Sequence, residues 1–112
     1  MSQWTKVCKT EDILANGGSC VNVDGEQIAI FNFDDRREWY AVQNMCPHKQ
    51  QFVLSRGLTG DAGGEPKVEC PLHKNTFSLR TGAHLGGNEE WKLKTYPIKI
   101  EGNDIFLSFN NG

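Results

Sequence analysis

The sequence predicts an all-β protein, and three observations support that prediction. Short segments with alternating apolar and polar residues, rich in valine, isoleucine and aromatic residues, recur along the chain. Turns that contain glycine separate them, most clearly at Asp24-Gly25. The 112 residues suffice for one domain, so we expect a single domain over residues 1–112. The architecture that fits is an antiparallel β sandwich or partly open barrel.

The first half of the chain contains the clearest strand signals. The segment VNVDGEQIAIFNF (residues 21–33) predicts a β hairpin, because two alternating runs flank an Asp-Gly pair. The polar turn DDRR then leads into a further predicted strand, Glu38–Gln43. One helical turn is expected around Glu11–Leu14, with Thr10 as its N-cap and Gly17 as its stop.

The second half of the chain alternates short strands with glycine-rich turns. Pro66–Cys70 and Thr76–Arg80 are predicted strands. The segment LKTYPIKIEGNDIFLSF closes the chain as a predicted hairpin that turns at Gly102-Asn103. Between the first half and these strands lies LSRGLTGDAGGEP (residues 54–66), whose glycines and final proline indicate a surface loop.

Composition excludes several classes of protein. The chain is 38% hydrophobic and 23% charged, which is typical of a globular domain. Its net charge of −2 gives no sign of nucleic-acid binding, and the longest clean apolar run, Ile28–Phe31, is far too short to span a membrane. The opening residues lack an apolar stretch long enough for a signal peptide. We therefore expect a cytoplasmic protein, in which four cysteines indicate metal binding or catalysis before disulfides.

Two short segments combine a cysteine, a proline, a histidine and a lysine. They are CPHK at Cys46–Lys49 and CPLHK at Cys70–Lys74. Thiolates and imidazoles bind zinc, copper and iron–sulfur centres, and the proline after each cysteine stiffens a tight loop. Two such loops facing each other would bring four ligands to one point. The predicted ligands are Cys46, His48, Cys70 and His73.

The spacing of these residues leaves two kinds of metal centre open. Two cysteines and two histidines suit a structural zinc site. Zinc motifs usually pair like residues, however, whereas here each loop supplies one cysteine and one histidine. A binuclear centre fits that arrangement better, because one iron can take both thiolates and the other both imidazoles.

The motif pair also resembles a known family. CPH followed by CPLHKNTFSLRTG is similar to the Rieske signature, and SQWTKVC, VLSRGLTG and GEPKVECPLHK resemble the small subunits of cytoplasmic NAD(P)H-dependent nitrite reductases. The resemblance covers nearly the whole chain. It implies a Rieske-type fold with a small cluster-binding lobe over approximately residues 45–85. It further implies that Cys46 and Cys70 hold the inner iron of a [2Fe–2S] cluster, and His48 and His73 the outer iron.

The same resemblance implies a function and a partner. The chain would be an electron-transfer subunit, with no catalytic residue of its own, in an enzyme that reduces nitrite to ammonium. The nitrite reductase large subunit would carry FAD, sirohaem and a [4Fe–4S] cluster and would bind nitrite. The chain has no G-x-G-x-x-G, so NAD(P)H should bind elsewhere. Two alternatives stay open: a free Rieske ferredoxin that serves an oxygenase, and a structural subunit with zinc or nothing in the site.

Some residues depart from the wider Rieske pattern. GDAGGEP lengthens the gap between the motifs as an inserted loop, and lysines follow both histidines. The cysteines that bridge the two loops in high-potential Rieske proteins are missing, so we expect a potential toward the ~−150 mV end of the Rieske range. Lys49 and Lys74 could form a basic rim that steers docking onto an acidic partner. Cys8 and Cys20 are expected to be packing residues, and His84 an exposed loop residue.

Overall fold

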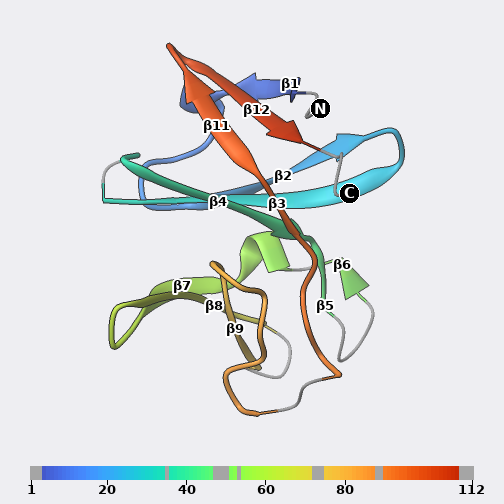
Figure 1. The fold of residues 1–112 in the computed structure, drawn as a ribbon, viewed down its shortest axis with the longest axis vertical. Coiled ribbons are helices and arrows are strands. Elements are labelled where there is room, and N and C mark those ends of the chain that lie inside the picture. The colour runs from blue at the N-terminus through green and yellow to red at the C-terminus, as the bar shows by residue number, and fades with distance from the viewer. Residues whose placement is uncertain are drawn as a thin grey trace.

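Strands are the main secondary structure in the part of the chain that the structure describes. The computed structural model describes residues 4–34, 36–46, 51–52, 54–71, 75–87 and 90–108. Within these ranges it contains twelve strands, in four antiparallel sheets, and two short 3-10 helices (Figure 1). This confirms the all-β prediction. No helix in the described part of the chain is long and apolar enough to cross a membrane.

Two sheets pack together to form a sandwich in the upper half of Figure 1. The first sheet has the order β10-β4-β3-β2 and comprises Thr95–Tyr96, Glu38–Gln43, Glu26–Phe33 and Gly18–Val23. The second has the order β1-β12-β11 and comprises Trp4–Lys9, Asp104–Ser108 and Ile98–Glu101. Side chains from both sheets, together with Ile13 from the segment between β1 and β2, form one sandwich core, whose other members are Ile28, Ile30, Ala41, Tyr96, Ile105 and Leu107.

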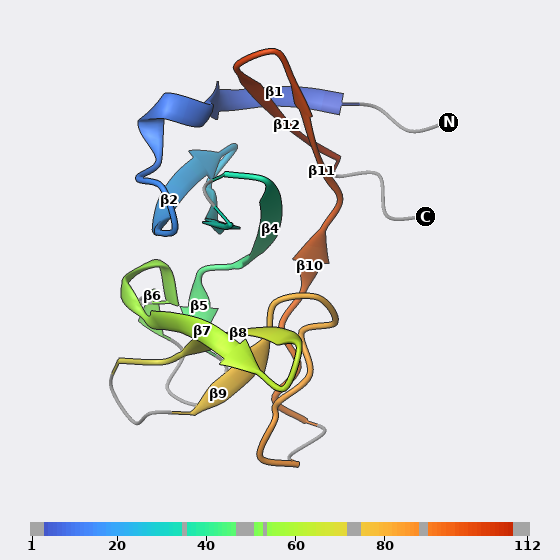
Figure 2. The same ribbon diagram turned by 90° about the vertical axis from the view of Figure 1, so that its left-hand side faces the viewer.

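A second group of strands lies below the sandwich (Figure 2). It comprises the paired strands β5 (Met45–Cys46) and β6 (Gln51–Phe52), and the sheet β7-β8-β9, formed by Leu58–Ala62, Glu65–Glu69 and Thr76–Ser78. The 3-10 helix η2 (Leu54–Arg56) lies between β6 and β7 in the chain. The lower core contains Ala29, Phe31, Val42, Cys46, Leu54, Val68, Cys70, Phe77, Leu79 and Leu93.

Strand β3 separates the two cores. Its residues Ile28–Phe31 are fully buried, and alternate side chains point to opposite faces. Ile28 and Ile30 join the sandwich core, whereas Ala29 and Phe31 join the lower core. The apolar run in the sequence therefore reflects a strand that is covered on both sides.

Both predicted hairpins are confirmed. In the first, Val23 pairs with Glu26, and the two intervening residues, Asp24 and Gly25, have φ values of 52° and 85°. Positive φ at both positions matches the twist of antiparallel strands, and Asp-Gly tolerates it. In the second hairpin, Glu101 pairs with Asp104 across Gly102-Asn103.

The predicted surface loop over residues 54–66 is wrong. This segment contains η2, strand β7 and the start of β8, and Ala62 pairs with Glu65 across a tight turn. Gly63 and Gly64 supply the φ values of 65° and 95° that this turn needs. The segment GDAGGEP is therefore the tip of a hairpin. Its glycines and aspartate are poor strand formers, and pairing with β8 overrides that preference.

The predicted helical turn is shorter and starts earlier than expected. A 3-10 helix, η1, spans Thr10–Asp12, and its N-cap is Lys9 rather than Thr10. The Asp12 carboxylate accepts the Lys9 backbone N–H at 2.9 Å. Ile13 then adopts an extended conformation and is buried in the sandwich core, so the helix cannot continue. Gly17 directly precedes strand β2.

Replacing Phe31 should destabilise the protein strongly. Phe31 is fully buried and belongs to the lower core. Phe31→Ala should therefore lower the free energy of unfolding by ~3–5 kcal/mol. Urea denaturation followed by circular dichroism measures this change. Leu14→Ala is the control, because the Leu14 side chain is 80% exposed and its loss should cost less than ~0.5 kcal/mol. Equal effects of the two substitutions would contradict the described core.

Candidate metal centre

The two cysteines of the predicted motifs lie in the same hydrophobic core. Cys46 and Cys70 both have zero exposed surface, and both belong to the lower core together with Phe77 and Leu54. They come from different hairpins, one ending β5 and the other following β8. The fold therefore brings the thiols of two separate sequence motifs into one water-excluded region.

The first motif belongs to a narrow hairpin. Cys46, the last residue of β5, pairs with Gln51, the first residue of β6. Next to these two strands, the Leu54 backbone N–H donates to the Asn44 carbonyl at 3.0 Å and closes the base of the hairpin. The predicted ligand His48 and the neighbouring Lys49 lie outside the described residues.

The second motif belongs to a similar hairpin between β8 and β9. Glu69 pairs with Thr76, and the Cys70 backbone N–H donates to the Asn75 carbonyl at 2.7 Å. Residues 72–74, which include the predicted ligand His73 and Lys74, lie outside the described residues. Each motif is thus held at the base of its hairpin by a backbone hydrogen bond.

The donor set fits a thiolate-bound metal centre. A buried thiolate in an apolar region is unfavourable unless a cation compensates its charge, and two thiolates in one core make this requirement stronger. A metal centre satisfies it. The described residues contain no group of three or more histidine, cysteine, aspartate or glutamate side chains that could hold a metal ion. Only two of the four predicted ligands fall within those residues.

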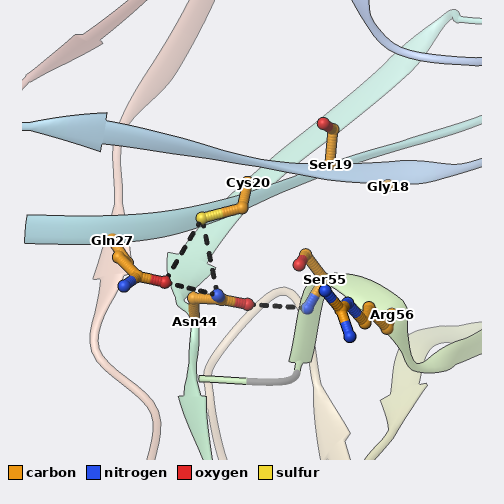
Figure 3. Close-up of a pocket in the computed structure, with 7 residues that line it drawn as sticks. All are labelled: Gly18, Ser19, Cys20, Gln27, Asn44, Ser55 and Arg56. Atoms are coloured by element: carbon orange, nitrogen blue, oxygen red, sulfur yellow. Dashed lines mark hydrogen bonds between the residues drawn. The ribbon is translucent and has the colours of Figure 1, made fainter.

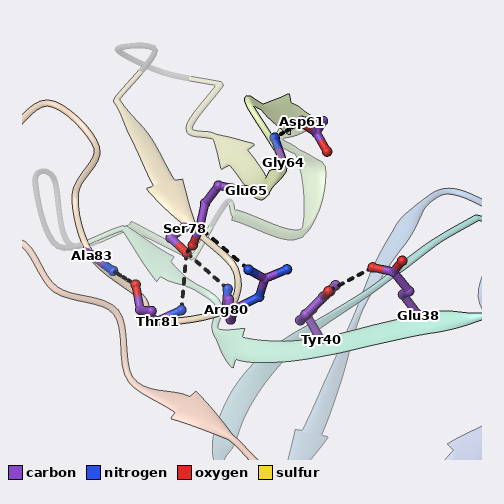
Figure 4. Close-up of polar contacts among 9 residues, drawn as sticks. All are labelled: Glu38, Tyr40, Asp61, Gly64, Glu65, Ser78, Arg80, Thr81 and Ala83. Atoms are coloured by element: carbon purple, nitrogen blue, oxygen red, sulfur yellow. Dashed lines mark hydrogen bonds and ion pairs between the residues drawn. The ribbon is translucent and has the colours of Figure 1, made fainter.

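A buried serine organises the turn that follows β9 (Figure 4). Ser78 is 1% exposed, and its hydroxyl oxygen accepts the backbone N–H groups of Arg80 and Thr81 at 3.2 Å. The same hydroxyl bonds to the Glu65 carboxylate, which also pairs with Arg80 at 3.6 Å. These contacts connect the end of β9 to the start of β8. They hold the far end of the sheet that carries the second motif.

The glycine of the Thr81-Gly82 turn has a steric role. Gly82 has a φ of 83°, and a Cβ at this position would lie 2.2 Å from the Leu93 carbonyl oxygen. The Leu93 N–H donates to the Gly82 carbonyl at 2.8 Å, so the two segments run in direct contact. Leu93 in turn is part of the lower core. Only glycine permits this close approach.

His84 is a packed residue, and the prediction of an exposed loop residue is wrong. The ring is half-buried, with its centroid 5.1 Å from Trp91 and 5.4 Å from Phe77. Its Nε2 lies 3.4 Å from the Asn75 side-chain oxygen. A bridge between residues 77 and 84 adds this segment to the β9 edge. The sequence around His84 carries no periodic signal that could have indicated this contact.

The two remaining cysteines differ from each other. Cys8 packs against the sandwich core as predicted, and burial, with a contribution from the Asp12 charge, raises its pKa to about 11. Cys20 is exposed on β2, so its prediction as a packing residue is wrong. Partial desolvation of its sulfur still raises the pKa of the Cys20 thiol above its usual value.

Comparison with known proteins places the chain in a class. The family model for Rieske-like [2Fe-2S] domains matches residues 3–108, nearly the whole chain. The chain therefore belongs to the Rieske-like [2Fe-2S] domain family.

Individual relatives within that family are also similar to this chain. The chain is 38% identical to a nitrite reductase (NADH) small subunit of Salmonella typhimurium, over 96% of this chain and 98% of the relative. It is 37% identical to the biphenyl dioxygenase ferredoxin subunit of a Pseudomonas strain, over 96% of this chain and 93% of that protein. The solution structure of Escherichia coli NirD superposes with a TM-score of 0.87 at 34% identity, covering 99% of this chain and all of that one.

One relative is much longer than this chain. A nitrite reductase [NAD(P)H] large subunit of Klebsiella oxytoca is 38% identical over 104 residues. The match covers 93% of this chain but only 11% of that protein. The long polypeptide therefore contains a domain similar to this chain.

Labelling of the metal-free protein with a thiol reagent tests the burial of the four cysteines. Cys20 should react first, because it is exposed, and Cys46 and Cys70 should react only after unfolding. A raised pKa reduces the thiolate fraction at neutral pH, so the Cys20 rate should keep rising above about pH 9. Cys20→Ser should abolish this first phase. Labelling of Cys70 at the same rate in folded protein would contradict its burial.

Proposed function

We propose that the chain is the electron-transfer small subunit of an NAD(P)H-dependent nitrite reductase and carries a Rieske [2Fe–2S] cluster. One structural observation carries the proposal: Cys46 and Cys70, from two separate Cys/His motifs, share one buried core. Membership of the Rieske-like family and the likeness to nitrite reductase small subunits support it. The whole chain, 1–112, would act as one domain, with a cluster-binding lobe over approximately residues 45–85.

The proposed ligands divide by chemistry. Cys46 and Cys70 would hold the inner iron as thiolates, and His48 and His73 would hold the outer iron through imidazole nitrogens. Such a cluster supplies reversible one-electron transfer. The protein keeps water from the thiolate side through the fully buried side chains of the lower core, which include Leu54, Val68 and Phe77. It also fixes the Cys70 backbone N–H by a hydrogen bond to the Asn75 carbonyl, and it pairs Cys46 with Gln51.

The proposed partner is the nitrite reductase large subunit. The Klebsiella oxytoca protein of that name contains a domain similar to this chain. A large subunit and a domain of this kind therefore occur together in one polypeptide, which supports the proposed partnership. In this proposal the large subunit carries FAD, sirohaem and a [4Fe–4S] cluster, and it converts nitrite to ammonium. The small chain delivers electrons or docks, and has no nitrite reductase activity alone. A cytoplasmic location belongs to the same proposal and rests on the resemblance to a cytoplasmic enzyme.

A free ferredoxin for an oxygenase is the second candidate. The observation that favours it is the 37% identity to a biphenyl dioxygenase ferredoxin subunit over nearly the whole of both chains. Both candidates use the same ligands, so the partner distinguishes them. The nitrite reductase subunit should co-purify with a large sirohaem protein, whereas the ferredoxin should support turnover of an oxygenase component. A structural subunit with zinc would be colourless when purified anaerobically.

Substitution of the proposed ligands tests the cluster. Cys46→Ser and His48→Ala should each abolish the iron and acid-labile sulfide of anaerobically purified protein, or change its electron paramagnetic resonance spectrum after reduction. His84→Ala is the matched control, because the third histidine of the chain packs on Trp91 and is not a proposed ligand. It should keep both iron and the signal. Zinc in the wild-type protein, or no metal after reconstitution, would overturn the proposed cluster.

Charge reversal tests whether the lysines beside the proposed ligands steer the partner. Lys49→Glu together with Lys74→Glu should slow electron delivery to the large subunit and flatten its dependence on salt, because attraction between opposite charges is lost. Stopped-flow reoxidation at several ionic strengths measures both effects. Lys9→Glu, an exposed change on β1 in the sandwich, is the control. Unchanged rates in the double variant would exclude a steering role.

A further inference from the structure

We propose that Asn44 is a positioning residue for the metal centre, an inference that rests on the proposed function. Asn44 directly precedes strand β5, which ends at Cys46. Asn44 is only 2% exposed, although asparagine is usually a surface residue. A buried amide must satisfy its hydrogen-bonding groups within the protein, so its partners indicate what it holds.

Asn44 closes the first motif's loop with both its backbone and its side chain. The Leu54 N–H donates to the Asn44 backbone carbonyl at 3.0 Å, and the Ser55 N–H donates to the Asn44 side-chain oxygen at 2.7 Å. The chain therefore leaves the junction at residue 44 and returns to the same residue at 54 and 55. The loop between these points contains both Cys46 and the proposed ligand His48.

The same side chain also fixes this loop to the sandwich (Figure 3). The Asn44 side-chain nitrogen donates to the Gln27 side-chain oxygen at 3.1 Å and to the Cys20 sulfur at 3.4 Å. The Asn44 backbone N–H donates to the Gln27 carbonyl at 3.1 Å. One buried amide thus connects β2, β3 and η2 at the point where the sandwich meets the lower strands.

The loop needs this support because its own pairing is short. Strands β5 and β6 contribute only two residue pairs, Met45 with Phe52 and Cys46 with Gln51. A two-stranded ribbon of that length is not stable alone in water. The position of Cys46 relative to Cys70 therefore depends on how the base of the loop is held. The Ser55 N–H donates to the Asn44 side-chain oxygen across that base.

A second buried asparagine provides a matched control. Asn32, on β3, is fully buried, and its side-chain nitrogen donates to the Leu14 carbonyl at 2.8 Å. Its side-chain oxygen accepts the Asn16 N–H at 2.7 Å. Asn32 therefore closes a loop in the same way as Asn44, but within residues 14–16, which contain none of the proposed ligands. Replacing either residue by alanine removes the side-chain partner of partly buried backbone groups.

The test compares Asn44→Ala with Asn32→Ala in anaerobically purified protein. Both variants should lower the urea midpoint to a similar extent. Asn44→Ala alone should lose iron to a chelator at least ~10-fold faster than wild type. It alone should also shift the reduction potential and the electron paramagnetic resonance spectrum, because groups that support metal ligands control the affinity and the electronic structure of the metal centre. In metal-free protein, hydrogen exchange of the Ser55 amide should rise by ~10-fold, the effect of about one hydrogen bond.

Asn44→Asp keeps the inference testable if Asn44→Ala does not fold. The carboxylate retains an oxygen that can accept the Ser55 N–H, and the Gln27 amide can turn its donor group toward it. This variant should lose iron more slowly than Asn44→Ala, or within ~3-fold of wild type if the alanine variant cannot be purified.

The outcomes separate this inference from the proposed function. If wild-type protein holds the cluster but Asn44→Ala loses iron no faster than Asn32→Ala, with an unchanged spectrum and potential, the positioning role is overturned and the cluster stands. Rapid iron loss from Asn44→Asp, with the Ser55 amide still protected, overturns it as well. If wild-type protein takes up no iron after reconstitution, the proposed function fails and this inference fails with it.

Discussion

The burial of two cysteine sulfurs in one apolar core is the constraint on which the rest of the structure depends. Cys46 and Cys70 are both fully buried, yet each is the first residue of a Cys-Pro pair at the end of a strand. A thiolate in such surroundings is strongly destabilised without a neighbouring cation. A metal centre removes that penalty, and because its ligands come from two hairpins, binding it also contributes to folding.

The strands are arranged to hold these two hairpins against a rigid support. Strand β3 is buried on both faces and separates the sandwich core from the lower core, which contains both cysteines. Asn44 connects the first hairpin to that strand. Ser78 and Gly82 fix the end of the sheet that presents the second hairpin. Polar side chains and glycines at the ends of strands thus position the site, while the apolar residues supply stability.

Local signals predicted the parts of the fold that local chemistry decides. The Asp24-Gly25 and Gly102-Asn103 turns were identified because the backbone conformation of a tight hairpin selects those residues. The two Cys/His motifs were identified because ligand type and spacing are local as well. Strand β7 was missed, since its pairing with β8 overrides glycine-rich, strand-disfavouring sequence. The packing of His84 on Trp91 and the closure of the loop by Asn44 depend on contacts that no local pattern encodes.

Pulsed electron paramagnetic resonance of the reduced protein, prepared with nitrogen-15 only in its histidines, tests the central claim most directly. The account predicts coupling of the reduced centre to two histidine nitrogens, and loss of one coupling in either His48→Ala or His73→Ala if the centre survives the change. His84→Ala should leave both couplings in place. A reduced iron–sulfur centre without histidine coupling, or a protein that binds only zinc, would contradict the mixed-ligand cluster.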